Sequence, residues 1–302
     1  MEPRKTDERR DRRRPYARNR RRDAPVALRD LLELTQNFHN FGLDIGVIKG
    51  CISISDVTRL GRDGRDVEIE RFKQYFKNLG ELGVPVVAYD WMAGKRWTRT
   101  STAIPIRGEF LTTGYDDLIK SAPNQELAPV DAEELWQGLE HFLNEVVPVA
   151  EKAGVKLALH PDDPPIDTLR GVDRIVTSSE NYDRVMEIHD SEYNGITFCQ
   201  GHLAAMGVDI PETIHHFSDR IIFIHFRDVR GEDNHFVETW HDDGPTDMRT
   251  CIEAYRDIGL EGPARPDHVP TMASEANTNP GYMALGRLYA VGYMKGLLKA
   301  TE

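Results

Sequence analysis

Two features are scarce in this sequence: cysteine and long apolar runs. Its 302 residues include three cysteines, Cys51, Cys199 and Cys251. An odd and widely spaced set does not suggest a disulfide framework. No stretch approaches the roughly 18 apolar residues that a membrane-spanning helix requires, and the first residues hold no apolar signal segment. We therefore expect a protein of the reducing cytoplasm with no membrane partner.

Positive charge is also scarce in most of the chain. Residues 24–302 carry 27 basic and 45 acidic residues, a net charge of −18, and only nine of the basic residues are lysines. Such an acidic surface repels nucleic acid and favours solubility at high salt. A salt-adapted organism and an ordinary acidic enzyme both fit this composition, which does not separate them.

The first 23 residues have the opposite charge. They hold 11 basic and 5 acidic residues and almost no apolar ones, so we predict a disordered basic segment over residues 1–25. A single catalytic domain is predicted over 26–302. The basic segment could bind nucleic acid or an acidic partner, or it could result from a mis-assigned start.

Helical and strand patterns alternate from residue 26 onward. The apolar spacing predicts helices over 26–42, 67–83, 132–153, 181–191, 213–220, 246–259 and 280–299. Short, nearly continuous apolar strands are predicted over 43–50, 84–92, 156–160, 194–202, 221–229 and 262–268. This alternation indicates a parallel sheet in an α/β domain. Residues 95–117 are too long for a simple connection and suggest a lid or binding loop.

Four successive strands end in side chains that could bind a metal. These are His160, Cys199, His225 and Asp267, separated by 39, 26 and 42 residues, each close to one strand–helix repeat. The carboxyl ends of parallel strands meet at one edge of a sheet, so we expect the four side chains to converge. One buried His or Cys alone would more often be a packed core residue.

The ligand types restrict the metal and the chemistry. Two imidazoles, one thiolate and one carboxylate suit Mn²⁺, Fe²⁺, Co²⁺ or Zn²⁺. An open coordination position would let a substrate carboxylate or hydroxyl bind the metal as a Lewis acid. Arg227, two residues after His225, could hold a carboxylate by two parallel hydrogen bonds, or could be a solvated arginine. His241 lies on the polar loop that follows.

The segment HPDDPP, residues 160–165, fixes polar side chains on a stiff loop at a strand end, because its prolines allow neither a sheet ladder nor a helix. The alternative is a polar turn that only ends the strand.

These residues resemble the mannonate dehydratase family. The resemblance is carried from about residue 27 to the end by HPDDPP (160–165), FCQGHLAAMG (198–207), IHFRDVRG (224–231), RPDH (265–268), WTRT (97–100) and NPGYMALGRLYAVGYMKGL. It implies a xylose-isomerase-like TIM barrel that converts a small-molecule sugar acid, D-mannonate, to 2-keto-3-deoxy-D-gluconate in hexuronate breakdown. It also implies a homodimer, Mn²⁺ or Fe²⁺ as cofactor, and metal binding by the four converging residues, His160, Cys199, His225 and Asp267.

The resemblance also implies roles for neighbouring residues. His268 and Asp267 are the leading pair for proton transfer, with His268 the better candidate because Asp267 binds metal. Tyr282 is a further acid or substrate contact. Substrate contacts are expected from Arg227, Arg99, His241 and Asp163. The sequence does not say which group is the acid and which the base.

The sequence departs from the family at its start. The family begins with two more barrel strands, whereas this position holds the basic segment, which has no apolar run able to form a strand. We therefore expect a TIM-type (β/α)8 barrel lacking its first two strands, and we favour a mis-assigned start. Asp90 and the segment IPIRGEFLTTG also depart from the family and could alter substrate choice.

Three other functions compete with the dehydratase. A sugar isomerase or epimerase is disfavoured by Cys199 and by the adjacent Asp267 and His268 of RPDH, because those enzymes usually use carboxylates and histidines. A metal-dependent phosphodiesterase acting on DNA is disfavoured by the acidic body. An inactive, truncated relative would follow from the missing strands.

Overall fold

The structure, a computed structural model, describes residues 27–50, 52, 54–94, 96–119 and 129–302. The predicted basic segment 1–25 and Cys51 lie outside the described residues. No helix in the described part of the chain is long and apolar enough to cross a membrane.

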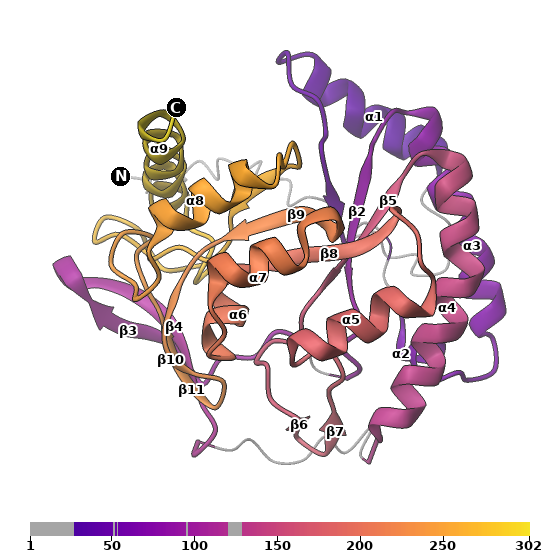
Figure 1. Ribbon diagram of the computed structural model, residues 1–302, viewed down its shortest axis with the longest axis horizontal. Coiled ribbons are helices and arrows are strands. Elements are labelled where there is room, and N and C mark those ends of the chain that lie inside the picture. Colours follow the sequence, from indigo (N-terminus) through magenta and orange to yellow (C-terminus); the bar gives the residue numbers. More distant parts are fainter. Residues whose placement is uncertain (1–26, 51, 53, 95, 120–128) are drawn as a thin grey trace, which may run out of the picture.

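A curled, six-stranded parallel sheet forms the centre of the fold (Figure 1). Its strands, in spatial order, are β1 (Ile48–Lys49), β2 (Val86–Asp90), β5 (Lys156–His160), β8 (Asn194–Cys199), β9 (Ile221–Phe226) and β12 (Ala264–Pro266). All six predicted strands are present in chain order. Among the described residues, β1 and β12 form the two edges of this half-barrel.

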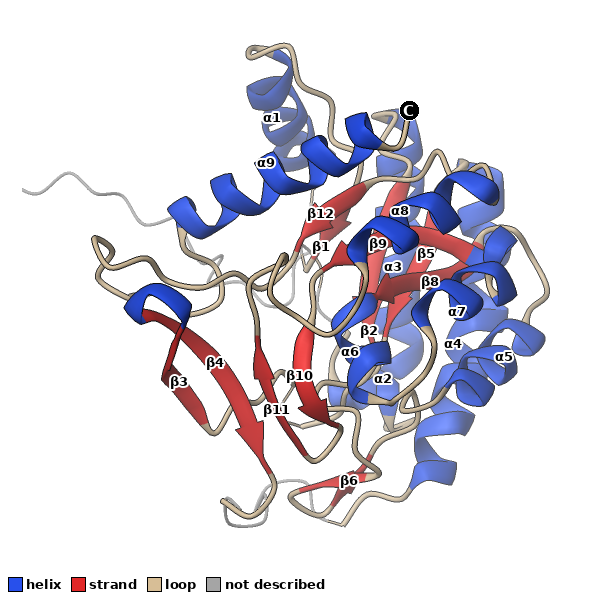
Figure 2. Ribbon diagram, turned by 60° about the vertical axis from the view of Figure 1, so that its left-hand side comes forward, coloured by secondary structure: helices blue, strands red, loops and turns tan. Residues whose placement is uncertain are grey.

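Helices follow the strands as predicted. They are α1 (Leu28–His39), α3 (Arg65–Glu81), α4 (Ala132–Ala153), α5 (Ser179–Ile188), α7 (Ile210–His216), α8 (Met248–Asp257) and α9 (Ala284–Ala300). Two short helices, α2 (Asp56–Arg59) and α6 (Gln200–Ala205), were not predicted. Helix α9 packs beside the edge strand β12 (Figure 2).

A second, antiparallel sheet was also not predicted. It contains, in order, β10 (Val229–Glu232), β11 (His235–Glu238), β4 (Phe110–Asp116) and β3 (Ser101–Ile106). The segment 95–117, predicted as a lid or binding loop, instead contains the β3–β4 hairpin. Its Thr and Ile residues favour strands, but their partner β11 is over 110 residues away in sequence, beyond the reach of local patterns. A further two-stranded sheet joins β6 (Thr168–Leu169) and β7 (Val172–Asp173).

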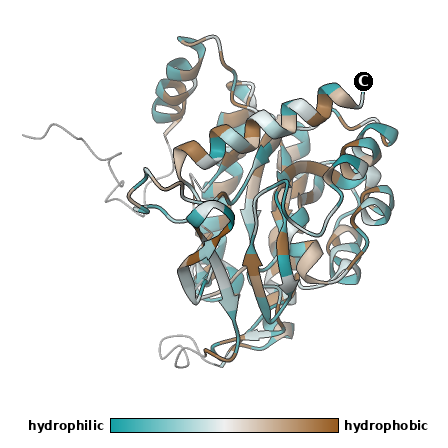
Figure 3. Cartoon of the chain, turned by 90° about the vertical axis from the view of Figure 1, so that its left-hand side faces the viewer, coloured by the Kyte–Doolittle hydropathy of each residue, from teal (hydrophilic) through white to brown (hydrophobic). Residues whose placement is uncertain are grey.

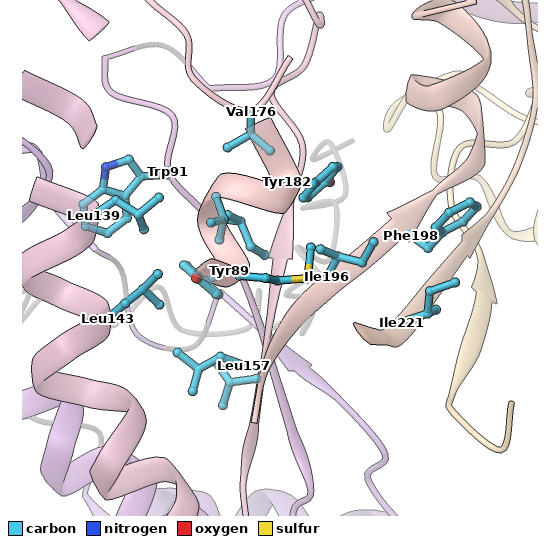
Figure 4. Packing of buried hydrophobic residues seen from close by; sticks show 14 of the residues in the cluster. Tyr89, Trp91, Leu139, Leu143, Leu157, Val176, Tyr182, Ile196, Phe198 and Ile221 are labelled. Carbon is cyan, nitrogen blue, oxygen red and sulfur yellow. The ribbon is translucent and has the colours of Figure 1, made fainter. Parts of the chain in front are cut away.

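Helix α4 shows how the outer layer packs on the sheet. The side chain of Asp131 accepts a hydrogen bond from the Glu134 backbone N–H (2.8 Å) and caps the helix start. Gly154 ends the helix in the left-handed conformation (φ 69°). The buried face includes Leu139, which Figure 4 shows beside Trp91, and Leu143, which lies lower in that view. Figure 3 shows apolar residues along the strands and hydrophilic ones on many outer helical turns.

Close backbone approach requires glycine within α4. A Cβ on Gly138 would lie 2.0 Å from the carbonyl oxygen of Arg59 at the end of α2. This contact packs the end of α2 directly against α4.

We expect Gly138→Ala to lower the free energy of unfolding by about 1–3 kcal/mol, because the methyl group would displace the Arg59 backbone. Gly296→Ala is the matched control, since nothing lies within 4 Å of its added Cβ. The control should raise stability by about 1 kcal/mol through helix propensity. Urea unfolding curves measure both changes. Equal stabilisation by the two substitutions would contradict the close contact.

Candidate metal centre

The four predicted metal ligands converge at the carboxyl edge of the parallel sheet. His160 and Cys199 end β5 and β8, His225 lies in β9, and Asp267 directly follows β12. One ligand atom from each lies within 4.8 Å of the others, and all four residues are buried. The predicted convergence is therefore confirmed, since parallel pairing sets Cys199 opposite His225.

The hydrogen bonds of the two histidines fit a cation between them. His160 Nδ1 donates to the Pro161 carbonyl (2.8 Å), which leaves a lone pair on Nε2. Burial lowers the pKa of His160 to about 3, so this ring is neutral, as a metal ligand must be. Its Nε2 lies 3.1 Å from His225 Nδ1, which is 3.4 Å from Asp267 Oδ2. His225 Nε2 is buried and has no hydrogen-bond partner among the described residues.

Either neutral tautomer of His225 is unfavourable without a cation. A proton on Nδ1 leaves a buried lone pair unsatisfied at Nε2. A proton on Nε2 leaves that donor unsatisfied and points the Nδ1 lone pair at those of His160 and Asp267. A bound cation removes the second conflict, so the nitrogen, sulfur and oxygen donors fit a divalent metal.

Cys199 is set up as a thiolate. Arg227 Nε lies 3.4 Å from its sulfur, and His202 Nδ1 lies 3.0 Å from it. Burial alone raises the pKa of the Cys199 thiol, but the charges of Arg227 and His202 outweigh burial and hold the pKa well below its ordinary value. The thiolate is the form that binds metal.

Glu238, at the end of β11, links three side chains at the centre. Its Oε2 accepts from Arg227 Nη1 (2.6 Å), and its Oε1 accepts from Arg99 Nη2 (2.6 Å) and His268 Nδ1 (2.7 Å). Burial raises the pKa of Glu238, but Arg227, His268 and Arg99 together lower it to about 2. Sequence analysis missed Glu238, because its position depends on the second sheet.

His202 was also missed, although a local signal exists. It lies three residues after Cys199 on α6, a spacing that sets both side chains on one helix face. Its Nε2 lies 3.0 Å from Asp163 Oδ2. Burial lowers the pKa of His202, but Asp163 and Cys199 raise it to about 9, so the ring is positively charged.

The two aspartates of HPDDPP have different surroundings. Asp162 Oδ2 accepts from the backbone N–H groups of Ile175 (3.0 Å) and Val176 (2.8 Å), which fixes the loop. Asp163 faces the centre and is ion-paired with Arg99 and His202. Both interpretations of the segment therefore apply, one to each aspartate.

His268 and Tyr282 form a hydrogen-bonded pair beside the ligands. Since His268 Nδ1 donates to Glu238, its Nε2 is free to accept from the Tyr282 hydroxyl at 2.8 Å. Trp97 packs edge-on against His268, with 5.5 Å between ring centroids. Burial, followed by the charge of Asp267, raises the pKa of Tyr282, so the phenol stays neutral and can donate.

The predicted substrate contacts lie at or near this centre. The side chains of Arg99 and Arg227 are buried, and their guanidinium groups already donate to Asp163 and Glu238. His241 stacks on Phe226 and hydrogen-bonds its carbonyl (2.8 Å), and burial lowers its pKa to about 4. Contact of these residues with substrate stays a prediction.

Comparison with known proteins gives one family. The model of the D-mannonate dehydratase (UxuA) family matches residues 24–128 and 119–302. The mannonate dehydratase of Oceanobacillus iheyensis is 34% identical over 297 residues, which cover 89% of this chain and 84% of that protein. The crystal structure of mannonate dehydratase from Streptococcus suis serotype 2 superposes with a TM-score of 0.86 at 32% identity, over 92% of this chain and 85% of that one. A D-tagatose 3-epimerase-like protein has a TM-score of 0.59 at 16% identity and shares the fold alone.

We expect Cys199→Ser to weaken Mn²⁺ binding by about 10- to 100-fold and to lower activity with it, because a serine hydroxyl stays protonated where the thiolate binds. Titration of metal-free protein with Mn²⁺, followed by the electron paramagnetic resonance signal of the free ion, measures the affinity. Cys251→Ala is the matched control, since Cys251 lies buried on α8, outside the ligand group. Unchanged affinity in Cys199→Ser would remove this residue from the site.

Proposed function

The chain belongs to the D-mannonate dehydratase family, and on that premise we propose that it removes water from D-mannonate to give 2-keto-3-deoxy-D-gluconate in hexuronate breakdown. The buried His160, Cys199, His225 and Asp267 group carries the proposal, because it supplies a metal centre at the edge where such barrels bind substrate. The isomerase or epimerase alternative has only fold-level similarity in its favour.

We propose that these four residues hold Mn²⁺ or Fe²⁺. Their mixture of nitrogen, sulfur and oxygen donors suits such borderline cations. When bound, the cation acts as a Lewis acid that stabilises the negative charge developing on the sugar acid after its C2 proton leaves.

His268 is the proposed base for the C2 proton. The hydrogen bond from its Nδ1 to Glu238 fixes the tautomer, so Nε2 carries the lone pair. Glu238 also stabilises the imidazolium that forms when Nε2 takes the proton. Asp267, the neighbouring residue, is assigned to the metal rather than to proton transfer.

Tyr282 is the proposed acid for the departing 3-hydroxyl. Its phenol is neutral, since the surrounding protein raises its pKa, and its hydroxyl lies 2.8 Å from His268 Nε2. After the C3–O bond breaks, the proton from Tyr282 completes the water molecule. The proton held by His268 can return to Tyr282 along this hydrogen bond.

Arg227, Arg99, Asp163 and His241 form the proposed wall of the substrate pocket. The donor and acceptor atoms of these side chains that make no hydrogen bond within the protein would bind the sugar hydroxyls. We further propose that 26–302 is the catalytic domain, that the protein is a homodimer, and that it works in the cytoplasm, where Cys199 stays reduced.

Purified protein, stripped of metal and then supplied with Mn²⁺, is expected to form the 2-keto-3-deoxy product from D-mannonate. Without added metal, turnover should be lost, because the charge on the deprotonated acid is then unstabilised. Product is followed by reaction with thiobarbituric acid. Folded, Mn²⁺-loaded protein that leaves D-mannonate unchanged would favour the inactive relative or another substrate.

If Tyr282 is the acid and His268 the base, substitution of each should impair a different part of the reaction. Tyr282→Phe should dehydrate about 10²- to 10⁴-fold more slowly yet still exchange the C2 proton of D-mannonate for deuterium in D₂O. His268→Gln should lose both reactions. Nuclear magnetic resonance follows the C2 signal and the product together, and Mn²⁺ content is checked in each variant. Exchange that survives in His268→Gln but not in Tyr282→Phe would reverse the assignment.

A further inference from the structure

Besides the proposed metal, the carboxylate of a sugar acid calls for a cationic side chain, and the arginines described above do not readily provide one. Arg99 is paired with Asp163 and Glu238, Arg227 with Glu238, and Arg265 with Asp267. An arginine whose donors are already held by buried carboxylates can bind a new anion only by losing contacts. A cation without such a partner is better suited.

Arg287, on α9, is a cation without an acidic partner. Among the described residues, no carboxylate lies within 4.0 Å of its guanidinium, and its buried Nε has no hydrogen-bond acceptor. A half-buried guanidinium with an unused donor is unfavourable on its own. Burial and the charge of Arg265 oppose its positive charge, and Asp267 only partly offsets them.

The position of Arg287 connects it to the reacting groups. Its Cζ lies 5.2 Å from the centre of the Tyr282 ring, and the Tyr282 hydroxyl reaches His268 Nε2. A carboxylate bound at the guanidinium would therefore lie on the Tyr282 side of the centre. The adjoining C2 and C3 atoms would then be near the two groups proposed to move protons.

We propose that Arg287 binds the C1 carboxylate of the sugar acid and so selects acids over neutral polyols. The inference rests on the proposed function of the same site. A planar guanidinium binds a carboxylate through two parallel hydrogen bonds, which fixes direction as well as charge.

Lys49, at the end of β1, is a competing cation. It lies on β1, opposite the β12 side of the half-barrel, and has no ion pair or side-chain hydrogen bond among the described residues. The charge of Asp267 acts on Lys49 as well as on Arg287. Lys49 lacks the contact with Tyr282, and its ammonium is a point charge without a fixed direction. It therefore serves as the matched control.

The test compares Arg287→Met with Lys49→Met in the Mn²⁺-loaded protein. Arg287→Met should raise the KM for D-mannonate by roughly 10- to 150-fold, as expected for loss of hydrogen bonds to a charged group. Lys49→Met should change KM less than threefold. Mn²⁺ affinity should be unchanged in both variants.

A binding measurement separates recognition of the carboxylate from general damage. Calorimetry compares the 3-deoxy analogue of D-mannonate, which has no 3-hydroxyl to lose, with the neutral polyol D-mannitol. Arg287→Met should weaken binding of the acid and leave that of the polyol unchanged, and Arg287→Lys should recover part of the loss. Equal weakening of both ligands, or an unchanged KM, would overturn the assignment, and a KM effect confined to Lys49→Met would transfer it to Lys49.

The wild-type protein distinguishes failure of this inference from failure of the proposed function. If the wild type neither turns over D-mannonate nor binds its 3-deoxy analogue, the substrate proposal fails and this inference fails with it. If the wild type turns over D-mannonate and binds the analogue, and Arg287→Met has the same KM and the same affinity, only the role of Arg287 is rejected.

Discussion

The site depends on the burial of four acidic side chains around one point. Asp163, Cys199, Glu238 and Asp267 are each nearly inaccessible to water. Burial of unpaired charge is strongly unfavourable, so every one of them needs a fixed positive partner. Arg99, Arg227, Arg265 and His202 supply protein cations, and the four ligand atoms that meet at this point could add a metal ion. The ion pairs share partners, since Glu238 contacts both Arg99 and Arg227, and Asp163 contacts both Arg99 and His202. Loss of one charged side chain therefore leaves others unpaired.

This requirement explains the second sheet. Glu238 lies at the end of β11, and Arg99 lies just before β3, so pairing of these strands through β4 brings a carboxylate and a guanidinium to the parallel sheet. The hairpin that occupies the predicted loop thus takes part in the ion pairs of the centre. Arg99, next to this hairpin, pairs with Asp163 and Glu238, whereas Cys199 depends on Arg227 and His202.

How well each site residue could be predicted depends on how far apart in sequence its partners lie. His160, Cys199, His225 and Asp267 could be found because each ends a strand of one repeating unit, and parallel strands share an edge. His202 had a local signal, the helical spacing from Cys199. Glu238 pairs with Val229 in the β10–β11 hairpin, which brings it back to Arg227, but the polar residues of this segment gave no pattern that predicted the hairpin. The six strands were predictable from apolar runs, but the short helices and the hairpin were set by tertiary contacts.

Glu238 also connects the charge balance to the reaction. The carboxylate that neutralises Arg99 and Arg227 is the one that accepts the Nδ1 proton of His268. With both arginines paired to it, Glu238 stays ionised and accepts the Nδ1 proton, so in the neutral ring of His268 the lone pair is on Nε2, facing Tyr282. The orientation of the proposed base thus follows from the same electrostatics that make the buried centre stable. For this reason the chain needs no further residue to select the tautomer.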